Sequence, residues 1–191
     1  KWAQTADRKM ASEKGAGRLK ITGAAVDVLV HQWRAEEDAI MVGKNTAVLD
    51  NPLLTNRNPA GKNPVRVVTD PRLQLPESLQ LFNNMATTVV LNELKEDETG
   101  NLLYKKIENP SIPELLKPLW NMKINSLIVE GGATLLQSFI NSGIWDEARV
   151  ITNNKLFAAK GLLAPETPQG KITEELTIGN ETIKTIRNIQ A

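Results

Sequence analysis

The stretch IVEGGATLLQSFI, residues 128–140, decides the fold, because an apolar run in it ends at a carboxylate and two glycines before a helical pattern begins. The β-branched residues before Glu130 are typical of a buried strand, and residues 132–143 have helical spacing. Glycines between a strand and a helix allow the backbone to approach a ligand, and the N–H groups at the helix start favour an anion. The stretch therefore predicts a strand, a turn and a helix, with a ligand at the carboxyl end of the strand.

Simpler explanations of this turn remain open from the residues alone. The chain has neither the G-x-G-x-x-G pattern of a Rossmann fold nor the G-K-[ST] pattern of a P-loop, so Gly131 and Gly132 can be only a turn. Glu130 can be an exposed glutamate at a strand end, although burying it without partners would be costly.

Outward from this turn, short apolar runs alternate with helical patterns. We predict strands at 1–5, 38–43, 65–70, 87–92 and 125–131, and helices at 23–37, 111–123 and 132–143. This alternation is typical of an α/β fold with parallel strands. The last segments, 146–157, 174–181 and 182–189, have no helix between them, and a hairpin turn is predicted at 178–181. We therefore expect a mixed, mostly parallel sheet with antiparallel C-terminal edge strands.

Composition excludes several classes of function. The 191 residues have a net charge of +1, which argues against a general nucleic-acid binder. The absence of cysteine excludes disulfides and thiolate metal sites, and one histidine argues against a zinc site. No apolar run is long enough to span a membrane, and no signal peptide is visible. We expect a cytoplasmic protein with a single domain over 1–191, cut from a longer chain because residue 1 already lies in a strand pattern.

A second group of polar residues follows the strand that ends at Gly43. Thr46 can cap a short helix, and Asp50 before Asn51-Pro52 can form a turn. Arg34 can be a solvated arginine at the edge of a helix, or a phosphate ligand with Arg57 as its second member.

His31 lies one turn before Arg34, and we expect it to be an ordinary surface histidine.

Three motifs together resemble a known family. They are RAEEDAIMVG (34–43), DNPLLTNR (50–57) and VEGG (129–132), in this order and spacing. The chain resembles the reductase domains of the bifunctional riboflavin biosynthesis proteins of the RibD family, from residue 1 to about residue 164. The resemblance implies a three-layer fold similar to dihydrofolate reductase. It also implies NADPH as cofactor and the reduction of 5-amino-6-(5-phosphoribosylamino)uracil by hydride transfer to ribose C1′.

The resemblance further implies roles for individual residues. Arg34, Arg57 and the backbone at Leu54 would bind the substrate phosphate, Arg18 stands at a position that contacts substrate, and Glu130 would contact substrate near the reacting end, as the catalytic residue. The implied NADPH contacts are Ala3, Lys20, Thr46, Asp50, Pro71, Gly131, Gly132, Ala133, Thr134 and Leu135. The chain departs from the family at Arg8, Arg18 and Lys20, where glycine, serine and tryptophan are usual.

The family also suggests partners. We expect a small sugar-phosphate substrate, a homodimer, and a deaminase in another domain or protein, because these residues lack the Cys-x-x-Cys motif of zinc deaminases. Two alternatives stay open: a reductase of the same fold acting on another substrate such as a pterin, and a nucleotide-binding module that has lost catalysis.

Overall fold

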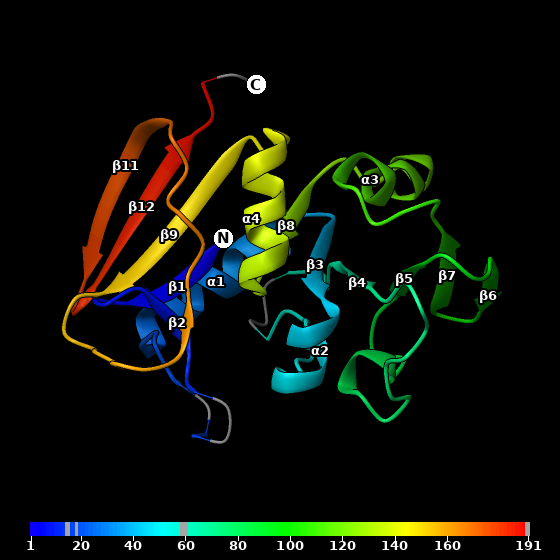
Figure 1. Cartoon of the computed structure of the whole chain (residues 1–191), viewed down its shortest axis with the longest axis horizontal. Helices are drawn as coiled ribbons and strands as arrows, with labels where there is room; N and C mark the ends of the chain where they lie inside the picture. Colours follow the sequence, from blue (N-terminus) through cyan, green and yellow to red (C-terminus); the bar gives the residue numbers. More distant parts are fainter. Residues whose placement is uncertain (14–15, 18, 58–60, 190–191) are drawn as a thin grey trace. The chain divides into compact units, whose positions relative to one another are not determined.

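The computed structural model describes residues 1–13, 16–17, 19–57 and 61–189. The contacts between residues divide the chain into two compact units, shown in Figure 1. Unit 1 comprises Lys1–Leu29 and Ala133–Ala191, and unit 2 comprises Val30–Gly132. No helix in the described part of the chain is long and apolar enough to cross a membrane. That residues 1–191 form a single reductase domain stays a prediction.

Unit 2 is built on a six-stranded sheet of order β6-β7-β5-β4-β3-β8 (Figure 1). The strands are β3 (Ala39–Gly43), β4 (Val65–Thr69), β5 (Thr88–Asn92), β6 (Asp97–Thr99), β7 (Leu102–Lys106) and β8 (Leu127–Val129). All neighbours pair in parallel except β6 with β7, which is antiparallel. The predicted strands at 38–43, 65–70, 87–92 and 125–131 are confirmed, whereas the strands β6 and β7 were not predicted.

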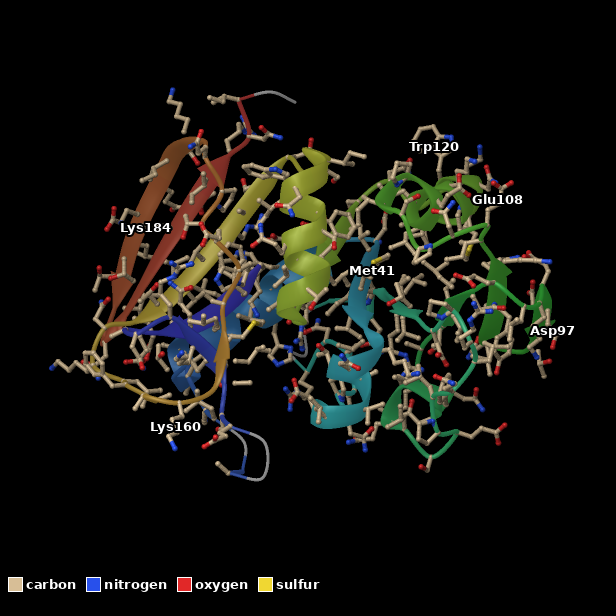
Figure 2. All side chains as sticks on the ribbon, viewed as in Figure 1. Met41, Asp97, Glu108, Trp120, Lys160 and Lys184 are labelled. Carbon is tan, nitrogen blue, oxygen red and sulfur yellow. The ribbon has the colours of Figure 1, made fainter. Side chains whose placement is uncertain are left out.

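The core of unit 2 lies on the central strands. Ile40, Val68 and Val90 from β3, β4 and β5 are almost completely buried in one cluster. Figure 2 labels Met41 on β3, which has no exposed surface, and Trp120 on α3 (Ile112–Asn121), whose side chain is 68% exposed. Burial on both sides of β3 explains why its sequence is an unbroken apolar run.

Two helices of unit 2 differ from the sequence prediction in detail. The short helix α2 (Lys44–Asp50) was not predicted, and its N-cap is Gly43, so the alternative of Thr46 as a cap is wrong. Helix α3 has Ser111 at its N-cap, but no side-chain hydrogen bond is formed there. Pro118 lies inside α3, which continues beyond it to Asn121.

Asp38 holds the start of β3 beside the start of β8. Its carboxylate accepts a hydrogen bond from the Asn125 N–H at 3.0 Å and one from Lys62 Nζ at 3.2 Å, and its own N–H donates to Ser126 Oγ at 2.8 Å. The Asn125 N–H, and then Lys62, hold the pKa of Asp38 below its usual range. The aspartate of the RAEEDAIMVG motif is therefore a structural residue that fixes the position of β8.

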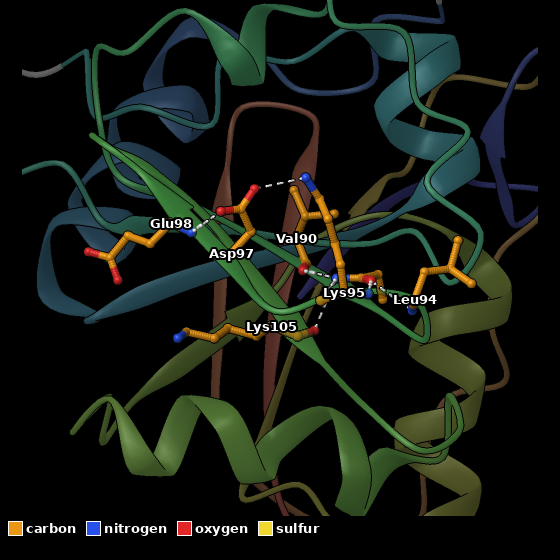
Figure 3. A network of polar contacts seen from close by, with 7 residues as sticks. Val90, Leu94, Lys95, Asp97, Glu98 and Lys105 are labelled. Carbon is orange, nitrogen blue, oxygen red and sulfur yellow. Dashed lines mark hydrogen bonds and ion pairs between the residues drawn. The ribbon is translucent and has the colours of Figure 1, made fainter.

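A polar network closes the far edge of the same sheet. Asn92, which is completely buried, donates to the carbonyl oxygens of Val90, Lys95 and Lys105 and accepts from the N–H groups of Leu94 and Lys95. Figure 3 shows this region, including the ion pair of Lys95 with Asp97 at 3.0 Å. These bonds fix the turn between β5 and β6, since a buried amide needs partners for all its polar atoms.

Unit 1 contains a four-stranded sheet of order β1-β9-β12-β11 (Figure 1). Its strands are β1 (Trp2–Thr5), β9 (Glu147–Asn153), β11 (Lys171–Ile178) and β12 (Glu181–Arg187), and a small second sheet pairs β2 (Lys9–Ala11) with β10 (Leu162–Leu163). β1 is parallel to β9, and β12 is antiparallel to both β9 and β11. The predicted antiparallel C-terminal strands and the hairpin at 178–181 are confirmed, but these strands belong to this separate four-stranded sheet and not, as predicted, to an edge of the mostly parallel sheet.

The helices α1 (Ala24–Glu36) and α4 (Ala133–Ser142) confirm two predicted helices. α1 begins in unit 1 and ends in unit 2. Val26 and Val30 on its predicted apolar face are buried. α4 buries Leu136 and Phe139, and Gly143 follows it with a φ of 71°, as expected of a C-terminal cap.

Candidate functional site

Three neighbouring parallel strands of unit 2 end at the same edge of the sheet. β3 lies between β4 and β8, with Gly43 in register with Thr69 and Met41 with Val129. The residues that follow these ends are Lys44 after β3, Asp70 after β4 and Glu130 after β8. Ligands of open α/β sheets bind at such an edge. The predicted strand-end position of Glu130 is thus confirmed, with charged residues beside it on two further strands.

Glu130 and Arg34 form a buried, bidentate ion pair. Arg34 Nε donates to Glu130 Oε1 and Arg34 Nη2 to Oε2, both at 2.8 Å. The two side chains are only 14% and 9% exposed. The alternatives of a solvated Arg34 and an exposed Glu130 are therefore wrong. The pair joins the last turn of α1 to the end of β8, although the two residues are 96 positions apart.

The glycine after Glu130 packs against α2. Gly131 has a φ of 74°, in the left-handed region, and a Cβ atom at this position would lie 3.0 Å from Thr46 Cγ2. Gly132 has the same φ of 74°. Two successive left-handed residues are accessible to glycine at little cost, which explains the pair in the sequence. The predicted ligand residues Thr46 and Gly131 are thus brought into contact.

The segment from Asn51 to Arg57 lies beside α1. The N–H of Arg57, a residue with an exposed side chain, donates to His31 Nδ1 at 3.2 Å. His31 and Arg34 are three residues apart on one helix and therefore share a face. His31 is partly exposed, in agreement with the expectation of a surface histidine, and in addition it binds the backbone of the segment. The three-residue spacing from Arg34 was the signal in the sequence.

A second buried carboxylate, Asp70, lies at the end of β4. It is 1% exposed, accepts from the Leu75 N–H at 2.8 Å through Oδ2, and has Lys44 Nζ at 4.0 Å from Oδ1. Lys44 is also hydrogen-bonded to Gln74. Asp70 follows an apolar strand in the sequence, as Glu130 does, but no prediction was made for Asp70. Pro71, a predicted cofactor residue, follows Asp70 directly and is half-buried.

The remaining predicted residues are described within their own units. In unit 2, Leu54 is buried and Asp50 is exposed at the end of α2. In unit 1, Ala3 is half-buried in β1 opposite Ile151, Lys20 is exposed, and the first turn of α4 holds Ala133, Thr134 and Leu135. Arg18 lies outside the described residues.

The charged groups at this edge of unit 2 can bind an anionic ligand through non-covalent contacts. It offers a fixed guanidinium–carboxylate pair, a lysine, and a turn of two left-handed glycines. Such a set can orient an anionic ligand and neutralise its charge.

The comparisons with known proteins agree with this arrangement. The model of the RibD C-terminal domain family matches residues 1–184, so the chain belongs to this family. A crystal structure from Thermotoga maritima, a diaminohydroxyphosphoribosylaminopyrimidine deaminase/5-amino-6-(5-phosphoribosylamino)uracil reductase, superposes with a TM-score of 0.86 and 27% identity. The superposed region covers 98% of this chain and 55% of the Thermotoga maritima chain. The predicted fold similar to dihydrofolate reductase is confirmed.

Two relatives illustrate the range of the family. The riboflavin biosynthesis protein RibD of Aquifex aeolicus is 32% identical over 97% of this chain and 54% of its own length. A 2,5-diamino-6-ribosylamino-4(3H)-pyrimidinone 5′-phosphate reductase of Methanothermobacter thermautotrophicus is 38% identical over 78% of this chain and 73% of its own. The chain thus spans about half the length of the RibD proteins that it matches. A reductase of this family uses a nicotinamide cofactor.

Proposed function

We propose that this chain reduces 5-amino-6-(5-phosphoribosylamino)uracil to its ribitylamino product with NADPH, as a step of riboflavin biosynthesis in the cytoplasm. The observation that supports it best is the Arg34–Glu130 pair at the strand ends, next to the contact of Gly131 with Thr46. A relative that matches 97% of this chain is named as a riboflavin biosynthesis protein, and one that matches 78% is named as a reductase of a ribosylaminopyrimidinone phosphate.

The residues of unit 2 would bind and orient the substrate. Glu130 holds Arg34 through Nε and Nη2 and so orients at the strand ends a guanidinium, a group that binds phosphates well. Arg57, whose backbone is tied to the same helix by His31, would supply the second positive charge. Glu130 would face the reacting end of the substrate, where its charge is oriented by Arg34. The proposal assigns no nucleophile to the protein.

The glycine turn fits a dinucleotide cofactor. Gly131 and Gly132 both have a φ of 74°, and such a glycine turn before the start of a helix leaves backbone N–H groups that favour a phosphate. A bound nicotinamide supplies the hydride for the reduction. Lys44, 4.0 Å from Asp70 at the same sheet edge, gives a positive charge that favours a 2′-phosphate, and hence NADPH over NADH.

The first experiment is a steady-state assay of NADPH oxidation with the chain and the phosphoribosylaminouracil. Turnover supports the proposal, and comparison with NADH measures the cofactor preference. The 2-amino analogue named by the Methanothermobacter relative, which differs at one pyrimidine position, is the competing substrate. NADPH binding without turnover on either pyrimidine would favour the module that has lost catalysis. Turnover on a pterin alone would favour the other alternative.

Arg57→Ala is expected to raise KM for the phosphorylated substrate roughly tenfold or more, because a charge-assisted phosphate contact contributes about 1.5–3 kcal/mol. The value of kcat should change little, since the phosphate takes no part in the hydride transfer. Arg187→Ala removes an exposed arginine of β12 in unit 1 and should leave KM unchanged. An unchanged KM for Arg57→Ala would show that Arg57 does not bind the phosphate.

Gly131→Ala is expected to weaken NADPH binding and to lower the free energy of unfolding by about 1–2 kcal/mol, since a left-handed residue with a Cβ is unfavourable. Gly100→Ala is the matched control, because Gly100 has a φ of 58° in unit 2 but no atom within 4 Å of its added Cβ. Calorimetry should show a similar loss of stability in both variants and weaker NADPH binding only at Gly131. If the two variants bind NADPH with equal affinity, Gly131 does not belong to the proposed cofactor site.

We further infer that the chain forms a homodimer through β11, the edge strand of the unit 1 sheet. Ile172 and Leu176 on this strand are 52% and 41% exposed, and an exposed apolar edge favours pairing with another strand. Light scattering should give the mass of a dimer for the wild type and of a monomer for Leu176→Lys. A monomeric wild type at all concentrations would contradict this.

A further inference from the structure

The segment Asn51–Arg57, which the proposed function places at the substrate phosphate, has an unfavourable backbone. Leu54 has a φ of 52° in the left-handed region, which is unfavourable for a leucine, whereas Asn51, with a φ of 40°, is the C-cap of α2, where asparagine is common. A leucine in this region persists only where the surrounding structure holds it. The contacts that hold this segment should therefore influence whatever it binds.

Gln80 holds the first residue of the segment from outside. Its N–H donates to Asn51 Oδ1 at 2.7 Å, and its side-chain Nε2 donates to the Asn51 carbonyl oxygen at 2.9 Å. The carbonyl oxygen of Gln80 in turn accepts from Arg66 Nη1 at 3.3 Å. Since Arg66 is 1% exposed and lies within β4, Gln80 connects the segment to the core of unit 2.

His31 holds the last residue of the segment. Its Nδ1 accepts the N–H of Arg57 at 3.2 Å, and the neighbouring Asn56 N–H donates to Asn63 Oδ1 at 2.9 Å. Both backbone amides are therefore bound by side chains rather than by secondary structure. The orientation of Arg57 then depends on an imidazole fixed to α1.

We propose that Gln80 and His31 are positioning residues that hold the phosphate-binding segment Asn51–Arg57 in its binding shape from its two ends. Neither residue is assigned a contact with substrate. The inference rests on the proposed function, because that function places the phosphate at Leu54 and Arg57. It predicts that losing either contact weakens recognition of the phosphate and leaves the reducing step intact.

The experiment uses ribose 5-phosphate as the binding probe in titration calorimetry, and the phosphorylated and dephosphorylated aminouracil nucleosides in steady-state assays. The variants are Gln80→Ala, His31→Leu and His31→Asn, the last of which can offer an acceptor oxygen near the Nδ1 position. The matched control is Gln32→Ala, since Gln32 is an exposed glutamine of the same unit that donates one hydrogen bond, at 2.9 Å, to Glu36.

Gln80→Ala and His31→Leu should each weaken ribose 5-phosphate binding and raise KM for the phosphorylated substrate by roughly three- to tenfold, the effect of one lost hydrogen bond. The value of kcat, and KM for the dephosphorylated nucleoside, should stay within twofold of the wild type. His31→Asn should recover most of the loss, and Gln32→Ala should show none. Thermal melting at the wild-type temperature would confirm that the variants are folded.

Three outcomes would overturn the inference: wild-type binding in both variants, an equal loss for both nucleosides, or a wild type that binds no ribose 5-phosphate. If the wild type binds ribose 5-phosphate but does not reduce the aminouracil, the proposed function fails while the binding comparison still tests the positioning residues. If His31→Leu does not fold, Gln80→Ala and His31→Asn provide the same comparison.

Discussion

Arg34→Leu is expected to lower the free energy of unfolding by about 3 kcal/mol and to abolish turnover, because it leaves the carboxylate of Glu130 buried without its guanidinium. Glu130 is 7% exposed, and both its oxygens accept from Arg34 at 2.8 Å. Breaking a buried ion pair from one side costs more than removing it, because a desolvated charge remains. Urea unfolding followed by circular dichroism measures the stability, and NADPH oxidation measures the activity.

The double variant Arg34→Leu/Glu130→Leu separates the two effects. Removing both charges should recover most of the lost stability, since an apolar pair replaces the buried ions. Activity should not return, because both groups belong to the proposed substrate site. Glu130→Gln alone should lower turnover while preserving the affinity for NADPH. Wild-type stability in the single variant Arg34→Leu would show that the pair is solvated in solution.

Arg66→Met is expected to lower the free energy of unfolding of unit 2 by roughly 3–5 kcal/mol, because it leaves several buried acceptors without a donor. The guanidinium donates to Asn83 Oδ1 at 2.9 Å and to the carbonyl oxygen of Ala86 at 2.6 Å, besides its bond to Gln80. Burial lowers the pKa of Arg66, but arginine starts so high that the charge remains at neutral pH.

Arg66→Lys is the informative comparison. A lysine keeps the positive charge but lacks the planar guanidinium that donates to several acceptors at once. The stability of Arg66→Lys should therefore lie between those of the wild type and Arg66→Met. Hydrogen exchange should locate the loss, with the amides of Thr88 and Phe82 exchanging faster than those of unit 1. A loss spread equally over both units would mean that Arg66 acts on global stability alone.

The sequence predicted the central strands well, for a physical reason. β3, β4 and β5 are buried on both faces and are therefore rich in apolar residues, with buried polar exceptions such as Arg66 and Asn92. β6 is exposed throughout and α2 has only seven residues, so neither leaves a periodic pattern. β7, with partly exposed side chains ending in two lysines, was missed for the same reason.

The site was predicted by residue but not by contact. Arg34 and Glu130 were each assigned to the substrate, yet their ion pair joins positions 96 apart, and one sequence gives no information about such partners. The resemblance to a family named both residues without indicating that they bind each other. His31 and Asp70 were missed because each was judged alone, whereas their importance comes from neighbours supplied by the fold.

The division of the chain into two units also bears on the order of folding during synthesis. Unit 2 is continuous in sequence, so all its strands are available once residue 132 has been made. In unit 1, by contrast, β1 (Trp2–Thr5) pairs with β9 (Glu147–Asn153), which lies far along the chain from it. Closing so large a loop is slow. On a ribosome, β1 would therefore wait without its partner while the sheet of unit 2 is already complete.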